Sequence, residues 1–200
     1  MAQRMSACAA CHGEEGRAAA DGFYPRIAGK PQEYLYRQLK NFQSQRRNYA
    51  PMTHMVKNLS DAYLKEIAQY FSQLELPYAA PAKIEASAAL LDRGEVLVKR
   101  GDTTKNLPAC NACHGESMTG MLPAVPGLLG LPKDYVASQI GAWKEGIRRG
   151  TAPDCMKKVA QQLSVDDLNA ISTWLALQPV PEKGKPAAQL DVPIAIRCDW

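Results

Sequence analysis

The residues of this chain best suited to chemistry fall in two copies of one short motif. The copies are Cys8-Ala-Ala-Cys11-His12 and Cys110-Asn-Ala-Cys113-His114. Cys-x-x-Cys-His is the attachment signature of a c-type haem. Two thiols at this spacing can bond the two vinyl groups of one porphyrin, and the next residue can place an imidazole on the iron. The sequence therefore predicts two covalently bound haem c groups, attached through Cys8, Cys11, Cys110 and Cys113, with His12 and His114 as iron ligands.

Two other kinds of site use the same residue types. A Cys-x-x-Cys pair can be a redox dithiol or half of a zinc site. A redox dithiol does not need the histidine that follows each pair here, and it has no reason to recur. A zinc site would join both pairs at one metal, although they lie about a hundred residues apart in the sequence. Haem attachment is therefore favoured over thiol or zinc chemistry.

Composition narrows the class of protein further. The chain has 200 residues and a formal net charge of +4, with no basic block or acidic tail, so nucleic-acid binding is not indicated. No apolar run approaches the length of a membrane span. The first motif follows only seven residues, and they do not form a signal peptide. Since covalent haem attachment in known c-type haem proteins implies export from the bacterial cytoplasm, we expect a mature or trimmed form of an exported protein.

The second half of the sequence repeats the first. The two motifs correspond, and the Pro and Gly pattern of residues 24–31 returns in residues 125–132. Matching positions in the following segment are Tyr34 and Tyr135, Gln38 and Gln139, and Phe42 and Trp143. This duplication predicts an N-terminal domain, 1–78, and a C-terminal domain, 79–200. The second domain ends in a Pro-rich tail, 179–200, that should be extended.

Hydrophobic periodicity predicts an all-α fold. Expected helices cover about residues 32–45, 61–74, 84–100 and 166–177. Ser60 should cap the second of these helices, whose apolar face would consist of Leu64, Ile67, Ala68 and Phe71. Residues 12–31 and 46–52 read as loops, and 76–82 as the linker.

The far side of each iron needs a second ligand if the protein is an electron carrier. A methionine sulfur there raises the reduction potential, whereas an open site permits small-ligand chemistry. Met52 and Met156 each stand seven residues before an aligned Leu-Ser pair, so they are the predicted metal ligands. Their alternative role is core packing. His54 competes for the first haem, but Lys158 occupies its position in the repeat, and His54 fits a surface residue better.

Residues around the ligands should orient them. The carbonyls of Pro25 and Pro126 are candidate acceptors for the two haem-ligating histidines, which need such a partner to fix the ring. The arginines just before the methionines could pair with haem propionates or could be solvated surface residues. They are Arg46, Arg47, Arg148 and Arg149.

Two cysteines remain outside the motifs. Cys155 and Cys198 form a disulfide candidate, because leftover cysteines in an oxidising compartment usually pair. Such a bond would tie the C-terminal tail to the segment beside Met156. The alternatives are free thiols, or Cys155 as an iron ligand in place of Met156.

With both motifs, both methionines and the duplication, residues 8–178 resemble the diheme cytochrome c4 family. That resemblance implies two tandem class I cytochrome c domains and a bacterial periplasmic location. It also implies electron transfer between redox protein partners: a donor dehydrogenase or bc-type complex, and an acceptor such as a terminal oxidase. Any membrane-surface association would come through those partners. Cys155 and the tail look like a subgroup that serves as electron acceptor of a dehydrogenase such as thiosulfate dehydrogenase. The short start before Cys8 puts in doubt the family's helix that packs across the last helix of the first domain.

Three functions compete on this basis. The first is an electron carrier with two His/Met-ligated haems and no catalytic residues. The second is a haem enzyme or enzyme subunit of the thiosulfate dehydrogenase or peroxidase type, in which one haem is differently ligated. The third is a small-ligand sensor with an open site. A methionine at the same place in both halves favours the carrier.

Overall fold

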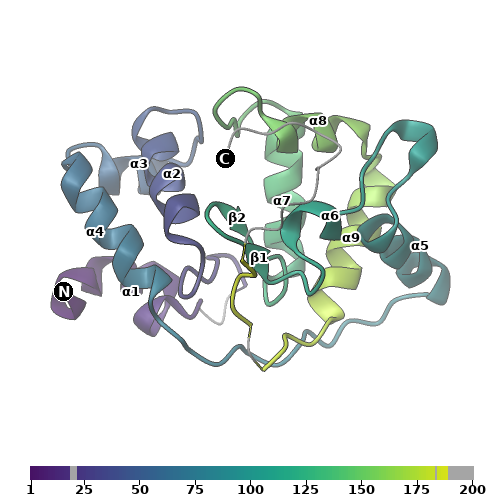
Figure 1. The fold of residues 1–200 in the computed structure, drawn as a ribbon, viewed down its shortest axis with the longest axis horizontal. Coiled ribbons are helices and arrows are strands. Elements are labelled where there is room, and N and C mark those ends of the chain that lie inside the picture. The colour runs from purple at the N-terminus through teal and green to yellow at the C-terminus, as the bar shows by residue number, and fades with distance from the viewer. Residues whose placement is uncertain (19–21, 183, 189–200) are drawn as a thin grey trace.

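The computed structural model describes residues 1–18, 22–182 and 184–188. Within these ranges the chain is helical apart from one short two-stranded sheet, which confirms the predicted all-α class (Figure 1). The helices of the first half are η1 (Ala2–Met5), α1 (Ser6–His12), η2 (Glu14–Gly16), α2 (Gln32–Gln43), α3 (Ala50–Val56) and α4 (Asp61–Ser72). Those of the second half are α5 (Ala88–Lys99), η3 (Thr103–Lys105), α6 (Asn111–His114), α7 (Lys133–Lys144), α8 (Cys155–Gln162) and α9 (Val165–Leu177).

Each half has its own hydrophobic core. One cluster of buried side chains joins η1, α2, α3 and α4, and the other joins α5, α7, α8 and α9. Figure 1 shows these two groups of helices side by side, with the chain between α4 and α5 running along one edge of the molecule. That connecting chain forms no helix or strand. The division at residue 78 is compatible with this arrangement and stays a prediction.

The helix that ends the first core forms as the sequence predicts. Ser60 caps α4 by accepting a hydrogen bond from the backbone N–H of Tyr63. The buried residues of α4 repeat at intervals of three and four, so they line one face of the helix. They are Leu64, Ile67, Ala68 and Phe71, as the periodicity indicates.

The helix that ends the second core is fixed at its start by a buried carboxylate. Asp167 accepts the Ser164 backbone N–H, and Ser164 in turn accepts the Asp167 N–H, which makes a capping box. The same carboxylate pairs with Arg93 of α5 at 2.7 Å and with Lys105 of η3 at 2.8 Å. Burial alone would raise the pKa of Asp167, but these partners outweigh burial and hold it well below its ordinary value.

The close crossing of α5 and α9 depends on a glycine. A Cβ atom at Gly94 would lie 2.4 Å from the carbonyl oxygen of Ala170 and 2.6 Å from Cβ of Trp174. Only a residue without a side chain lets the two helix backbones come this near. This contact fixes α5, the helix that precedes the second motif in the sequence, against α9.

The first half has no described helix that corresponds to α5. Instead, η1 packs beside α4, where Arg4 pairs with Glu66 at 3.3 Å and stacks on Tyr63. Met5 is buried in the core of this half. Within the described residues, the two repeats share the helices that follow the motif.

One expected loop is partly helical, and the structure adds two local features that the sequence did not predict. Residues 46–52 are not all loop, because α3 begins at Ala50. The segment of Met156 is also helical, as part of α8. Finally, β1 (Gly120–Met121) and β2 (Val125–Pro126) pair antiparallel in a segment with no strand-like alternation. The described part of the tail contains no helix, and Ala187 pairs with Met121 in an isolated bridge.

Candidate haem-binding sites

Both Cys-x-x-Cys-His motifs fold as the end of a helix. Cys8, Cys11 and His12 lie on α1, and His114 ends α6, for which Cys110 is the N-cap. One helical turn brings the two thiols and the imidazole of a motif to one end of the helix. His12 is 8% exposed and His114 is 6% exposed. Each motif therefore holds its histidine inside the protein, as a metal ligand requires.

A proline carbonyl fixes each of these rings. Nδ1 of His12 donates to the Pro25 carbonyl oxygen at 2.9 Å, and Nδ1 of His114 donates to that of Pro126 at 2.7 Å. Both predicted acceptors are thereby confirmed. Because a carbonyl can only accept, Nδ1 must be the protonated nitrogen, and Nε2 keeps its lone pair. That tautomer is the one in which Nε2 can bind a metal ion.

Burial also keeps the two imidazoles neutral. It lowers the pKa of both His12 and His114, while the proline carbonyls raise these pKa values in part. Arg47 lowers the pKa of His12 further, and Lys30 does the same for His114. A neutral imidazole is the form that coordinates iron.

The motif cysteines do not fit a redox dithiol or a zinc site, the two alternatives to haem attachment. Burial raises the pKa of Cys110 to about 12, and it also raises the pKa values of Cys8 and Cys113. Redox dithiols need a lowered thiol pKa, because the thiolate is the nucleophile. Among the described residues, no three His, Cys, Asp or Glu side chains gather closely enough to hold a metal ion, so a zinc site is not supported.

The two methionines predicted as iron ligands occupy equivalent places. Met52 lies on α3 and Met156 on α8, and both side chains are half-buried. Met52 packs against the same hydrophobic cluster as Cys8. His54, the competing ligand, is exposed, as expected of a surface residue. The structure thus keeps Met52 within its core, and the ligand assignment stays a prediction for both halves.

The four arginines before the methionines separate into two pairs. Arg46 and Arg149 are exposed, and each forms a hydrogen bond to the other half of the chain. Arg47 is half-buried and Arg148 is buried, with only 4% of its surface exposed. The reading of all four as solvated surface residues was therefore wrong for the inner pair. The reason is that Arg47 and Arg148 meet in an isolated antiparallel bridge between the two halves.

The inner pair binds polar side chains of the opposite repeat. Arg47 donates to Tyr135 at 3.0 Å and to Gln139 at 2.6 Å, while Arg148 donates to Tyr34 at 3.3 Å and to Gln38 at 2.9 Å. These four acceptors are two of the aligned pairs that reveal the duplication. The contacts therefore repeat about an approximate twofold axis. Sequence comparison found the equivalent residues but gave no sign that they face one another.

The same two arginines are cations without an anionic partner in the described part of the chain. Neither Arg47 nor Arg148 forms an ion pair there, and the side-chain oxygens that accept their hydrogen bonds are neutral. Buried cations are usually paired with acidic groups. A group that brings its own carboxylates would meet this need, and the propionates of haem are such carboxylates. The cysteines, the anchored histidines and these arginines together fit haem c.

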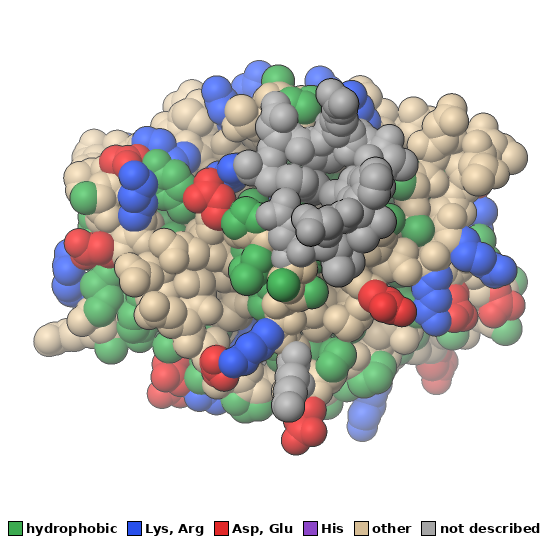
Figure 2. Space-filling model, viewed as in Figure 1, with side chains coloured by type: hydrophobic (Ala, Val, Ile, Leu, Met, Phe, Trp, Pro, Cys, Tyr) green, Lys and Arg blue, Asp and Glu red, His purple; other side chains and the backbone are tan. Residues whose placement is uncertain are grey.

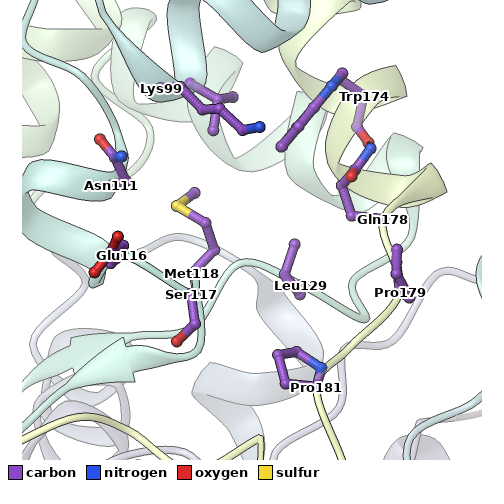
Figure 3. Close-up of a pocket in the computed structure, with 11 residues that line it drawn as sticks. Lys99, Asn111, Glu116, Ser117, Met118, Leu129, Trp174, Gln178, Pro179 and Pro181 are labelled. Carbon is purple, nitrogen blue, oxygen red and sulfur yellow. The ribbon is translucent and has the colours of Figure 1, made fainter.

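One cavity lies beside the second motif, whose Asn111 is part of its lining. Its volume is about 200 Å³, and Asn111, Met118, Trp174 and Pro179 are among its lining residues (Figure 3). Lys99 and Trp174 lie side by side in its lining, with the ammonium 5.6 Å from the ring centroid. Neither a motif cysteine nor His114 nor Met156 lines this cavity, so it is separate from the predicted iron ligands.

The predicted Cys155–Cys198 bond cannot be followed through the structure, because Cys198 lies outside the described residues. It stays a prediction.

No helix of the described residues is long and apolar enough to cross a membrane. On the face shown in Figure 2, acidic and basic side chains are interspersed, without one continuous basic surface.

Known proteins are similar to this chain in sequence and in fold. Residues 3–71 match the family model described as cytochrome c oxidase, cbb3-type, subunit III. The chain is 40% identical to a thiosulfate dehydrogenase electron acceptor of Thiomonas intermedia, over 88% of this chain and 80% of that protein. It is 33% identical to a cytochrome c4 of Pseudomonas aeruginosa, over 86% of this chain and 84% of the relative. A crystal structure of reduced cytochrome c4 from Pseudomonas stutzeri superposes with a TM-score of 0.75 at 31% identity, covering 88% of this chain and 95% of the other.

The helical fold, the Cys-x-x-Cys-His helices and the anchored histidines define a c-type cytochrome, which carries covalently bound haem. The chain belongs to the cytochrome c4 family. It is an electron-transfer protein and not an enzyme, so the electron-carrier expectation is confirmed at this level.

Proposed function

We propose that this chain is a periplasmic diheme cytochrome that transfers electrons between protein partners. The observation that carries the proposal is the same histidine-to-proline hydrogen bond in both halves, each next to its own Cys-x-x-Cys-His helix. A single haem would need only one such site. The periplasmic location follows from the covalent attachment of haem, which in bacteria takes place outside the cytoplasm.

The residues that would hold the two groups follow from the motifs. Cys8 and Cys11 would attach one haem and Cys110 and Cys113 the other. The iron ligands would be His12 with Met52 and His114 with Met156. When bound, the haem supplies one-electron oxidation and reduction. The protein's part is to hold each imidazole by its Nδ1 hydrogen bond and to exclude water from the buried ring.

The interface between the halves would serve electron exchange within the molecule. Arg47 and Arg148 hold the two repeats in a fixed relation through their hydrogen bonds to the opposite half. The connecting chain is held as well, since Arg26 donates to the carbonyl oxygens of Leu76 and Pro77. These contacts support two domains, 1–78 and 79–200, in a defined orientation. With the two domains held in this orientation, an electron could pass between the two haems without a domain movement.

The partners we propose are a donor dehydrogenase or bc-type complex and an acceptor such as a terminal oxidase. The relative of Thiomonas intermedia is named as an electron acceptor of thiosulfate dehydrogenase, which favours a dehydrogenase of this type as donor. Association with a membrane surface would come through these partners.

Absorption spectroscopy of the purified holoprotein tests the ligand assignment. Ferric haem ligated by methionine gives a weak far-red band, and two His/Met sites should give twice the intensity per chain of a single-haem standard. A band of half that intensity would show that one iron has a different ligand, and it would overturn the symmetric carrier. Substitution of His54 by Ala should leave the band unchanged.

A further inference from the structure

Lys30 is a buried cation that crosses between the two halves. It lies in the loop before α2 and is only 4% exposed. Its Nζ atom donates to the carbonyl oxygen of Gly127 in the second half at 3.0 Å. In the repeat, Leu131 occupies the position equivalent to Lys30. The contact therefore exists in one direction only, which distinguishes it from the paired contacts of Arg47 and Arg148.

This cation lies close to the second motif. Gly127 follows Pro126, whose carbonyl oxygen accepts from Nδ1 of His114 at 2.7 Å. The two hydrogen bonds and the backbone bonds between them limit the distance from Lys30 Nζ to His114 Nδ1 to at most about 12 Å. The Gly127 backbone packs closely against Thr119, since a Cβ at Gly127 would lie 2.4 Å from the carbonyl oxygen of Thr119. The Lys30 charge is thus held at a fixed position relative to His114.

Nothing in the described part of the chain neutralises Lys30. No carboxylate forms an ion pair with it there, and the nearest charged group that affects it is another cation, Arg26. Burial, with a smaller effect from Arg26, lowers the pKa of Lys30 to about 7. The side chain is therefore mostly protonated at pH 6. Keeping an unpaired ammonium group inside a protein is costly, and a leucine occupies this position in the other half without such a cost.

We propose that the Lys30 ammonium group, held against the Gly127 carbonyl, raises the reduction potential of the haem bound through His114. This inference rests on the proposed function and adds a residue that sets the potential of one of its two sites. Lys30 is a positioning residue in this role, because it acts on the iron through space and through the Pro126–Gly127 backbone. A fixed positive charge favours the reduced iron, which carries one positive charge fewer.

The size of the effect follows from Coulomb's law. The iron would bind Nε2, on the other side of the ring from Nδ1, so a separation of about 12 Å between its charge and the Lys30 ammonium group is an order-of-magnitude value. Two unit charges at that distance, in a medium of effective dielectric constant about 20, interact strongly enough to change an equilibrium roughly tenfold. For a one-electron couple, a tenfold change corresponds to about 59 mV. The effect on the haem at His12 should be smaller, because Arg47 and not Lys30 is the cation that acts on His12.

The test compares reduction potentials of the holoprotein with Lys30→Met at pH 6. A spectroelectrochemical titration resolves two one-electron steps, and NMR connects each haem to its own axial histidine. We expect the potential of the His114 haem to fall by about 59 mV, a tenfold change in its equilibrium, and that of the other haem by less than a third as much. Lys30→Arg should keep most of the wild-type value. Lys57→Met removes an exposed charge from the same half and should change neither potential.

The wild-type chain provides a second measurement that needs no substitution. Between pH 6 and pH 8 the His114 potential should fall as Lys30 loses its proton, whereas it should stay level in Lys30→Met. The groups that face Lys30 are Arg26, which stays charged, the neutral Gly127 carbonyl, and His114 itself. Tyr78 lies beyond Arg26, and burial raises its pKa, so it stays neutral in this range.

Two results would overturn the inference. One is a folded Lys30→Met variant with two haems and an unchanged His114 potential. The other is an equal fall at both haems, which would indicate a loosened interface instead of a local charge. A wild-type chain without two covalent haems would refute the proposed function itself, and that outcome is recognised before any potential is measured.

Discussion

Replacing Gly94 by alanine should destabilise the second half, although alanine is the better helix former. The helix propensity of α5 would improve by about 1 kcal/mol. Against this, the new Cβ would meet the Ala170 carbonyl oxygen at 2.4 Å and Trp174 Cβ at 2.6 Å. Overpacking of this kind costs about 1–3 kcal/mol, and a backbone neighbour that cannot rotate away puts the cost near the upper end. We expect the free energy of unfolding to fall by about 2 kcal/mol.

A matched control is available in the same half. Gly141 also lies inside a helix, α7, but a Cβ there would meet nothing within 4 Å. Gly141→Ala should therefore show the propensity gain alone and raise the free energy of unfolding by about 0.5–1 kcal/mol. The two variants make the same chemical change and should move stability in opposite directions.

Urea unfolding of the holoprotein, followed by far-ultraviolet circular dichroism, measures both changes. A stabilising Gly94→Ala variant would contradict the reasoning, because it would mean that α5 and α9 cross with room for a side chain. A loss of stability in both variants would show that alanine brings no gain in helix propensity at Gly141, and the comparison would then not isolate the clash at Gly94.

Three further predictions concern the buried charges and the iron ligands. Asp167→Asn should lower the free energy of unfolding by about 2 kcal/mol at neutral pH, since Asp167 is buried but its cations are about one-third exposed. Folding lowers the Asp167 pKa, so its contribution is complete above about pH 4, the unfolded value, and decreases as the pH falls. The wild-type and variant urea midpoints should therefore converge in acid, whereas Asp92→Asn, at an exposed position of α5, should show little change. Arg148→Leu should speed hydrogen exchange at the Arg149 amide, which donates across the interface at 2.7 Å; unchanged exchange would mean that the backbone bridge holds without the guanidinium. Met156→Ala should lower the potential of one haem and halve the far-red band, and an unaltered band would remove Met156 as a ligand.

Local signals in the sequence were sufficient for the motifs and the main helices. Ser60 and its apolar face at Leu64, Ile67, Ala68 and Phe71 are local features, and they fold as the periodicity indicates. The roles of Pro25 and Pro126 could be predicted because a histidine ligand needs an acceptor and each proline follows its motif at a similar distance. The helical start at Ala50 was missed because Pro51, which is tolerated in a first helical turn, was read as a loop signal.

Contacts between the halves could not be predicted from the sequence in the same way. Tyr34 and Tyr135 stand out as equivalent residues, but equivalence does not show that they accept bonds from Arg148 and Arg47. Lys30 carries still less signal, since a lysine in a polar loop is usually solvated. It is buried only because the second half covers it, a tertiary effect that no local pattern records.

The central claim is that each half binds one haem through its own pair of cysteines. Intact-mass measurement of the denatured chain, produced in a host that matures c-type cytochromes, tests it most directly. Wild type should carry the mass of two haems. The double variant Cys8→Ala/Cys11→Ala should carry one haem, and so should the double variant Cys110→Ala/Cys113→Ala. A wild-type chain with one haem or none, or a double variant that still carries two, would contradict the account.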